Sequence, residues 1–354
     1  MELAKNSYKS EDVCILLKDI SGLVEPKPAS VRERLMQSGV HYCEMLPLEY
    51  EPSDDYIAQY EAALKNFSPA AAEAVAVVSE KIYCKHGENV CLVSLARAGI
   101  SAGVLIKHYI GKKYGVECAH YAISIIRGRG IDKNAMNYIL QRHNPASICF
   151  VDGWTGKGAI AGQLQEAMKD YPTIDPTVAV IADPAGITPL CGTHDDFLIA
   201  SSCLNSVVSG LISRTFLRSD IIGKDDFHGA AYYGNLADRD RTYEFINAVE
   251  SCMKYDDIPE ERLCDEFYDN RGQLKKIAEV FGISDINLIK PGIGEATRVL
   301  LRRTPDRVLI AQGCDRFYIS HILRLAEEKG VRVEEYPLTG YRCCGIIKNM
   351  PADA

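Results

Sequence analysis

The stretch SICFVDGWTGKGAIAG, residues 147–162, decides the fold. Its apolar run ends at Asp152, a turn with three glycines follows, and the apolar residues after residue 158 have helical spacing. A strand that leads through such a turn into a helix brings backbone N–H groups and the positive end of the helix dipole to one point. The stretch therefore predicts a strand, a loop and a helix that together hold a phosphate, with Thr155 donating a hydroxyl and Lys157 adding charge.

The same alternation recurs on both sides of this stretch. Short apolar runs at 89–95, 116–126, 177–183 and 196–202 read as strands, and helical patterns lie between most of them. A long helical pattern over 53–85 precedes them, with Ser53 as its expected cap. This order predicts an α/β fold with a doubly wound, mostly parallel sheet.

Ligands of parallel sheets bind at the carboxyl ends of the strands. Three loops occupy such positions here: LARAG (95–99), IIRGRGIDK (125–133) and VDGWTGKG (151–158). A nucleoside-triphosphate loop would need glycine at 151 and serine or threonine at 158, where the chain has Val151 and Gly158. A GxGxxG dinucleotide motif is also absent from this turn. A purely structural strand-to-helix turn is the alternative to a phosphate site.

Composition limits the remaining choices. The chain has 354 residues, 47% of them hydrophobic, and a net charge of −8, which argues against a broad nucleic-acid-binding face. Charged residues interrupt the first twenty residues, which argues against a signal peptide, and no apolar stretch is long enough to span a bilayer. We therefore expect a cytoplasmic protein without a membrane partner. The thirteen cysteines form no CxxC pair, so most of them are expected to be buried and reduced.

Two domains and a linker are expected. Residues 1–255 carry the larger α/β pattern, 256–282 form a charged helical linker, and 283–354 carry a smaller α/β pattern. Length alone allows two domains of ordinary size.

The order of the three loops resembles the type I phosphoribosyltransferases. That resemblance implies phosphoribosyl pyrophosphate as substrate and Mg²⁺ as cofactor, with Asp152 at the ribose and the metal. It implies a phosphate loop of Gly153, Thr155, Gly156, Lys157 and Gly158, a pyrophosphate loop with Arg97, Ala98 and Gly99, and a mobile catalytic loop with Arg127, Arg129 and Lys133. One departure concerns the ribose: the family usually has two neighbouring acids, whereas Gly153 and Trp154 follow Asp152 here.

A narrower resemblance rests on SLARAG, VDGWTGKGAI, ADPAG, CGTHDDFLIASSCLNSVVSGLISRT and DDFHGA. Together these are similar to the bacterial StiP family of tellurite-resistance and stress genes, whose label is cysteine protease. The label implies a thiol site, for which the candidates are Cys191, Cys203 and His194. The three-residue spacing of Cys191 and His194 argues against it, because thiol proteases generally join these groups from distant segments. The run His194-Asp195-Asp196 could instead hold magnesium or face a substrate.

The C-terminal part resembles the pelota-type RNA-binding domain. The segment from GIGEATRVLLRR to VRVEEYP carries the likeness, and Arg298 and Arg302, four apart, share a helix face. The resemblance implies RNA contact at Gly292, Gly294, Glu295, Arg298 and Arg302. A small domain used for dimerisation is the alternative.

These patterns together predict a transferase that moves a phosphoribosyl group to a base-like or RNA-linked acceptor in a stress pathway. The alternatives are a cysteine peptidase and a non-catalytic regulator associated with RNA. A homo-oligomer is expected in each case.

Overall fold

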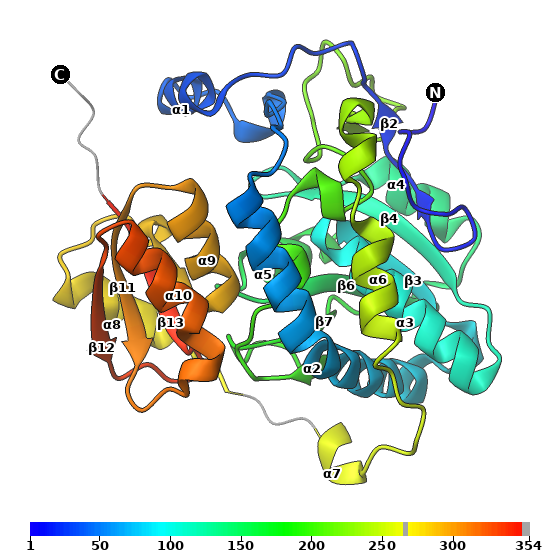
Figure 1. Cartoon of the computed structure of the whole chain (residues 1–354). Coiled ribbons are helices and arrows are strands. Elements are labelled where there is room, and N and C mark those ends of the chain that lie inside the picture. The colour runs from blue at the N-terminus through cyan, green and yellow to red at the C-terminus, as the bar shows by residue number, and fades with distance from the viewer. Residues whose placement is uncertain (265–267, 349–354) are drawn as a thin grey trace.

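The apolar run of the opening stretch forms strand β6 (Ile148–Trp154), which lies inside a seven-stranded sheet. A computed structural model describes residues 1–264 and 268–348, and Figure 1 shows this sheet beside a smaller one. The strand order is β1-β4-β3-β6-β7-β8, with β5 paired to β4. All pairs in this order are parallel, and only β5 runs antiparallel. Their bounds are β1 Cys14–Ile15, β3 Cys91–Ala96, β4 Ala119–Ile126, β5 Gly130–Ile131, β7 Val178–Ala182 and β8 Cys191–Thr193.

Helices cover both faces of the large sheet. On one face, side chains such as Leu92, Val151 and Ile181 pack against helices α2 (Asp54–His86), α3 (Ala98–Tyr114) and α6 (Thr242–Glu250). On the other face, Val93, Phe150 and Val180 pack against α4 (Lys133–Leu140) and α5 (Ala159–Met168). Successive strand residues point to opposite faces, so each buried strand contributes to both cores. The prediction of a doubly wound, mostly parallel sheet is confirmed.

The last predicted strand is wrong. Residues 196–202 form no strand: their apolar side chains are buried in irregular chain that ends in a 3₁₀ turn at Ala200–Ser202. The sheet instead ends with β8, whose three residues CGT carry no apolar run. Gly192 is needed there, because a Cβ atom would lie 2.0 Å from the carbonyl oxygen of Ala74 in α2.

The smaller sheet has the order β10-β13-β11-β12, with β11 and β12 parallel and the other pairs antiparallel. Its strands are β10 Ile289–Pro291, β11 Pro305–Ala311, β12 Arg332–Tyr336 and β13 Cys343–Ile347. Helices α9 (Ile293–Arg302) and α10 (Arg316–Glu328) share a continuous apolar core with α2 of the larger part, whereas α8 (Gly272–Val280) packs in a separate core. The α9 side of the small domain therefore faces the large domain (Figure 1).

The remaining elements lie at the edges. Helix α1 spans Ala29–Gln37, α7 spans Glu260–Leu263, and β2 (Lys18–Asp19) pairs with β9 (Gly229–Ala230). The predicted linker, 256–282, thus contains all of α7 and all of α8, and its residues 265–267 lie outside the described residues. None of the helices in the described ranges combines the length and apolar character needed to cross a bilayer.

Candidate active site

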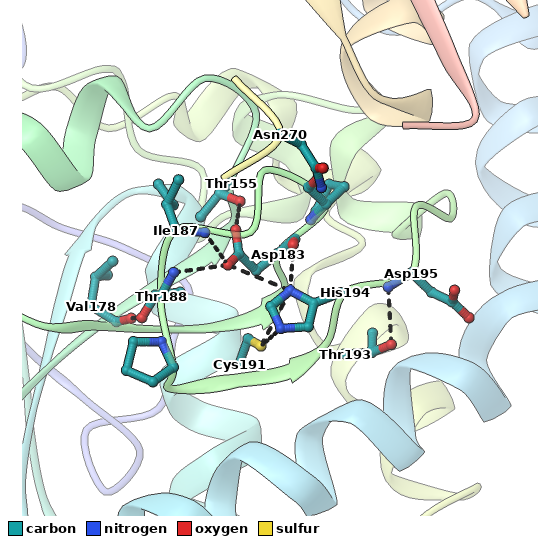
Figure 2. A network of polar contacts seen from close by, with 12 residues as sticks. Thr155, Val178, Asp183, Ile187, Thr188, Cys191, Thr193, His194, Asp195 and Asn270 are labelled. Atoms are coloured by element: carbon teal, nitrogen blue, oxygen red, sulfur yellow. Dashed lines mark hydrogen bonds and ion pairs between the residues drawn. The ribbon is translucent and has the colours of Figure 1, made fainter. Parts of the chain in front are cut away.

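Strand β8, the residue after it and the residue after β7 bring a thiol, an imidazole and a carboxylate together (Figure 2). The Sγ atom of Cys191 lies 3.5 Å from Nε2 of His194. Nδ1 of the same ring lies 3.9 Å from Sγ, 2.9 Å from the backbone carbonyl oxygen of Asp183 and 3.7 Å from the carboxylate oxygen Oδ2 of Asp183. Because a carbonyl oxygen can only accept, the contact with Asp183 assigns the ring proton to Nδ1 and makes Nε2 the acceptor nitrogen of the ring.

Local chain geometry explains why two residues only three apart can meet. Strand β8 places Cys191 beside Val180 of β7 and ends at Thr193, beside Ala182. The backbone N–H of Asp183 donates to the carbonyl of Thr193 at 2.8 Å, so β7 and β8 end together. His194 follows directly and its ring turns back over the end of β7. A spacing of three residues is therefore compatible with a thiol–imidazole contact.

Asp183 holds the loop between the two strands. Its Oδ2 accepts hydrogen bonds from the backbone N–H groups of Ile187 (2.7 Å) and Thr188 (2.9 Å), and its Oδ1 accepts one from the Thr155 hydroxyl. The carboxylate is completely buried, so these three donors compensate its loss of hydration. Asp183 was not among the expected site residues, although it follows an apolar strand as Asp152 does.

The thiol itself is buried: only 2% of Cys191 is exposed. The segment after residue 267 lies close by, since the Tyr268 ring stands edge-on to the His194 ring at 6.0 Å. The N–H of Asn270 donates to the carbonyl of Ala185 at 2.9 Å. A Cβ atom at Gly186 would lie 1.4 Å from the Tyr268 carbonyl oxygen, so glycine permits this close contact. Tyr268 and Asn270 therefore lie beside the His194 ring and the loop after β7.

A metal ion is the other use of such a cluster, because the ligand atoms of Asp183, Cys191 and His194 all lie within 4.8 Å of one another. Both Asp183 oxygens already accept hydrogen bonds, and Nδ1 of His194 is bound to a carbonyl. A metal ion held by this cluster would compete with these hydrogen bonds, because a catalytic zinc site uses three protein ligands. The arrangement fits a nucleophile and a base better than a metal centre.

Cys203, the other thiol candidate, lies elsewhere. It is completely buried, and burial raises the pKa of its thiol to about 12. Its carbonyl accepts a hydrogen bond from Arg302, and no histidine is among the described partners of its side chain. Asp196, expected in a magnesium or substrate site, instead accepts hydrogen bonds from the N–H groups of Ile293 and Arg342 and so joins the two domains.

The predicted phosphate loop lines a separate pocket of about 310 Å³ between the two domains. The larger domain contributes Asp152 and the loop after β6, and the smaller one contributes β10 and the start of α9. Nine expected site residues line it: Ala98, Arg127, Asp152, Thr155, Gly156, Lys157, Gly158, Glu295 and Arg298. The volume is within the range of small-molecule sites.

The pocket changes the acid–base character of two groups. Burial raises the pKa of Asp152 to about 7, and burial together with nearby Lys290 and Arg127 lowers the pKa of Lys157 to about 8. Lys157 also donates to the carbonyl of Ile286 in the smaller domain at 2.9 Å. Perturbed groups of this kind concentrate at functional sites.

Other expected residues lie outside this pocket. Arg129 pairs with Glu44 at 2.8 Å and Lys133 with Asp170 at 2.7 Å, both on the surface. Gly99 serves close packing, because a Cβ atom there would lie 2.2 Å from the carbonyl oxygen of Val151. Arg97, Gly153, Gly292, Gly294 and Arg302 are likewise not part of the lining.

The expected RNA face of α9 is turned toward the larger domain. Arg302 donates to Oδ1 of Asn205 and to the carbonyl of Cys203, both at 2.6 Å. Gly292 lies against Asp196, and Gly294 lies against Ser202. These positions therefore make contacts within the chain.

The fold and this site define a two-domain α/β protein with a thiol–imidazole pair at the end of its parallel sheet. The chain matches the family described as tellurite-like stress resistance cysteine protease StiP over residues 6–250, and the PELOTA RNA binding domain over 269–349. It is 35% identical to the cysteine protease StiP of Acinetobacter baylyi (strain ATCC 33305 / BD413 / ADP1), over 97% of this chain and 94% of that protein. The chain belongs to the StiP family. No solved structure matches it.

Proposed function

We propose that the chain is a thiol hydrolase of the cysteine-peptidase class, with Cys191 as nucleophile and His194 as general base. The observation that carries the proposal is the 3.5 Å contact between Cys191 Sγ and His194 Nε2, on a ring fixed through Nδ1. A nucleophile, a base and a group that orients the base are the parts this chemistry requires. The name of the Acinetobacter relative supports the peptide-hydrolase class.

The proposed reaction proceeds in two stages. Nε2 of His194 accepts the thiol proton as Sγ of Cys191 bonds to the substrate carbonyl carbon. The imidazolium then gives that proton to the leaving amine as the carbon–nitrogen bond breaks, which leaves a thioester on Cys191. In the second stage Nε2 of His194 accepts a proton from water as the water oxygen bonds to the thioester carbon. The carbon–sulfur bond then breaks, the acid is released, and the imidazolium returns its proton to Sγ of Cys191.

Hydrolysis of a mixed set of fluorogenic peptides by the purified full chain tests this proposal. We expect Cys191→Ser to abolish turnover and Cys203→Ser, a matched change of a buried thiol outside the site, to retain it. Turnover that survives in Cys191→Ser would remove the proposal.

Phosphoribosyl transfer is a second proposal. It is favoured by one observation: Asp152, Thr155 and Lys157 line the same pocket, and the pKa values of Asp152 and Lys157 are both shifted toward neutrality. In this proposal Asp152 interacts with the ribose and the loop holds the 5-phosphate. Calorimetry with phosphoribosyl pyrophosphate tests it, and the absence of binding at millimolar donor would rule it out.

Magnesium does not fit the pocket well. Asp152 carries a raised pKa, and the other carboxylate in the lining, Glu295, pairs with Arg298 at 3.2 Å. Mg²⁺ binds oxygen ligands, most often carboxylates. The lining has four cationic side chains, Arg127, Lys157, Lys290 and Arg298, and only two carboxyl groups, so it repels a divalent cation. Neither proposed reaction includes a step at a metal ion.

RNA binding is proposed only for surfaces of the smaller domain that the larger domain leaves open. The match to the PELOTA RNA binding domain supports it. Because α9 packs against the larger domain, binding through Arg302 would require the domains to separate. An RNA filter-binding titration of the full chain, compared with Arg302→Ala, distinguishes RNA binding at the open surfaces of the smaller domain from RNA binding through Arg302.

A further inference from the structure

The chain directly after His194 is held by the smaller domain. The carboxylate of Asp196 is buried, and its Oδ1 and Oδ2 accept hydrogen bonds from the backbone N–H of Ile293 at 2.9 and 3.1 Å. Its Oδ2 also accepts a hydrogen bond from the backbone N–H of Arg342 at 2.8 Å. Within residues 1–264 and 268–348, every hydrogen-bond donor to this carboxylate belongs to the smaller domain.

The contact with Ile293 is a helix cap that comes from the other domain. Helix α9 begins at Ile293, and the residue at its cap position is Gly292, which has no side chain to accept the first N–H groups. Asp196 takes that role, and a negative charge at the start of a helix is favourable. A Cβ atom at Gly292 would lie 3.3 Å from Oδ1 of Asp196, so glycine leaves room for the carboxylate. The start of α9 and the chain after His194 are therefore linked.

The side chain of Arg342 holds the same segment. Its Nη1 donates to the backbone carbonyl of Asp196 at 2.6 Å, and its Nη2 lies 3.5 Å from Oδ1 of Asp195. The guanidinium lies 3.8 Å from the centroid of the Tyr318 ring, which restricts its rotation. The smaller domain therefore fixes both the backbone and the carboxylates of the two residues that follow His194.

The carbonyl that orients the His194 ring is also bordered by this part of the chain. Nδ1 of His194 lies 2.9 Å from the carbonyl oxygen of Asp183. Two residues further on, the carbonyl of Ala185 accepts a hydrogen bond from the N–H of Asn270 at 2.9 Å. Asn270 lies within 269–349, the range that matches the PELOTA domain, and Ala185 is buried in the core of that domain. Contacts with the smaller domain therefore lie next to the base and next to the group that orients it.

Within the described chain, no strand continues past Thr193 to hold the base from the larger domain. Strand β8 ends there, and residues 194–199 are irregular. A general base works when its nitrogen stays within hydrogen-bond reach of the proton that it accepts, and a misplacement of about 1 Å can cost about 100-fold in rate. The 3.5 Å contact between Cys191 Sγ and His194 Nε2 therefore depends on how the chain after His194 is held.

We propose that Asp196 and Arg342 are positioning residues of the thiol site, so that His194 is correctly placed only while the smaller domain is docked. The inference rests on the proposed thiol hydrolysis and names what regulates it. Neither residue takes part in proton or acyl transfer, because both act through the position of His194. The smaller domain thereby has a role in the reaction that does not depend on RNA.

The rate at which iodoacetamide alkylates Cys191 in the full chain tests the proposal with two matched arginines. Arg342→Met removes the side-chain bonds described above. Arg324→Met is the control, because Arg324 also joins the smaller domain to the larger one, through a 3.2 Å hydrogen bond to Gln59 of α2. We expect Arg342→Met to slow the alkylation of Cys191 by about tenfold and Arg324→Met to leave it unchanged. Arg342→Lys, which keeps a charged donor, should retain most of the rate.

Peptide hydrolysis gives a second comparison. Arg342→Met should lower kcat and leave KM unchanged, because the arginine places the base and does not hold the substrate. A loss of Cys191 reactivity that is equal in Arg342→Met and Arg324→Met would show that weaker docking of any kind is enough, and would overturn the proposal.

A spectroscopic readout separates positioning from folding. Long-range ¹H–¹⁵N correlation spectra report the tautomer of the His194 ring, and His194→Gln assigns its signals. We expect the Nδ1-protonated form in the parent and in Arg324→Met, and a mixture of tautomers in Arg342→Met. Identical His194 signals in all three proteins would overturn the proposal.

Failure of the proposed function has a different signature. Peptide turnover that survives in Cys191→Ser, or that is absent from the parent, would remove thiol hydrolysis. The His194 signals of Arg342→Met would still decide whether the smaller domain positions the ring.

Discussion

The hydroxyl of Thr155 donates a hydrogen bond to Oδ1 of Asp183, so the loop of the interdomain pocket touches the thiol site directly. The backbone N–H of Thr155 also donates to the carbonyl of Ala182 at the end of β7. Thr155 is buried and Asp183 has no contact with solvent. The glycine-rich loop after β6 therefore has two roles: one side faces the pocket and the other supports the residue that fixes His194.

The first prediction concerns this contact. Thr155→Val keeps the shape of the side chain but removes the donor, which leaves one oxygen of a buried carboxylate without its partner. We expect the free energy of unfolding to fall by about 2 kcal/mol in urea titrations. Thr155→Ser, which keeps the hydroxyl, should lose much less of its free energy of unfolding. Equal stability of the valine variant and the parent would contradict the role given to Thr155.

The second prediction concerns pH. Burial raises the folded-state pKa of Asp152 to about 7, above its ordinary value of 3.8. A carboxyl with a raised pKa contributes most to stability below pH 4, and that contribution is lost as pH rises through 7. Asp152→Asn should therefore gain stability relative to the parent between pH 4 and pH 8, in paired urea titrations. A difference that does not change with pH would show that Asp152 is not buried as a neutral acid.

The third prediction concerns the joint between the domains. Arg302→Ala removes the donors to Asn205 and Cys203, which lie in the larger domain. Hydrogen bonds of a charged donor contribute about 2 kcal/mol, so we expect a loss of that order in stability. Amide hydrogen exchange should rise at residues 200–208 and along α9. Arg316→Ala, at an exposed position on α10, is the control and should change neither quantity.

Much of the large sheet could be predicted because its strands are buried on both faces. The runs at 89–95, 116–126, 148–151 and 177–183 overlap β3, β4, β6 and β7, since a parallel strand between two helical layers is apolar throughout. Strand β8 was missed because three residues with a central glycine carry no such signal. The apolar residues at 196–200 were misread, because irregular buried chain and a buried strand have the same composition.

The site was predictable only in part, because sequence does not show which charges meet. Asp152, Thr155 and Lys157 line a pocket as expected, since a strand end and a glycine turn restrict where their side chains can lie. Arg129 and Lys133 pair with acids 85 and 37 residues away, which no local pattern indicates. Lys290 was missed for the same reason, because it lines a pocket that residues of both domains form.

The most direct measurement is the rate at which iodoacetamide alkylates Cys191 in the folded full chain, followed by mass spectrometry. Cys203 is the internal control, because it is at least as deeply buried and lacks a histidine partner in the described chain. We expect Cys191 to react at least about tenfold faster than Cys203, and His194→Gln to remove the difference. Equal rates for the two thiols, or a fast rate that persists in His194→Gln, would contradict this expectation.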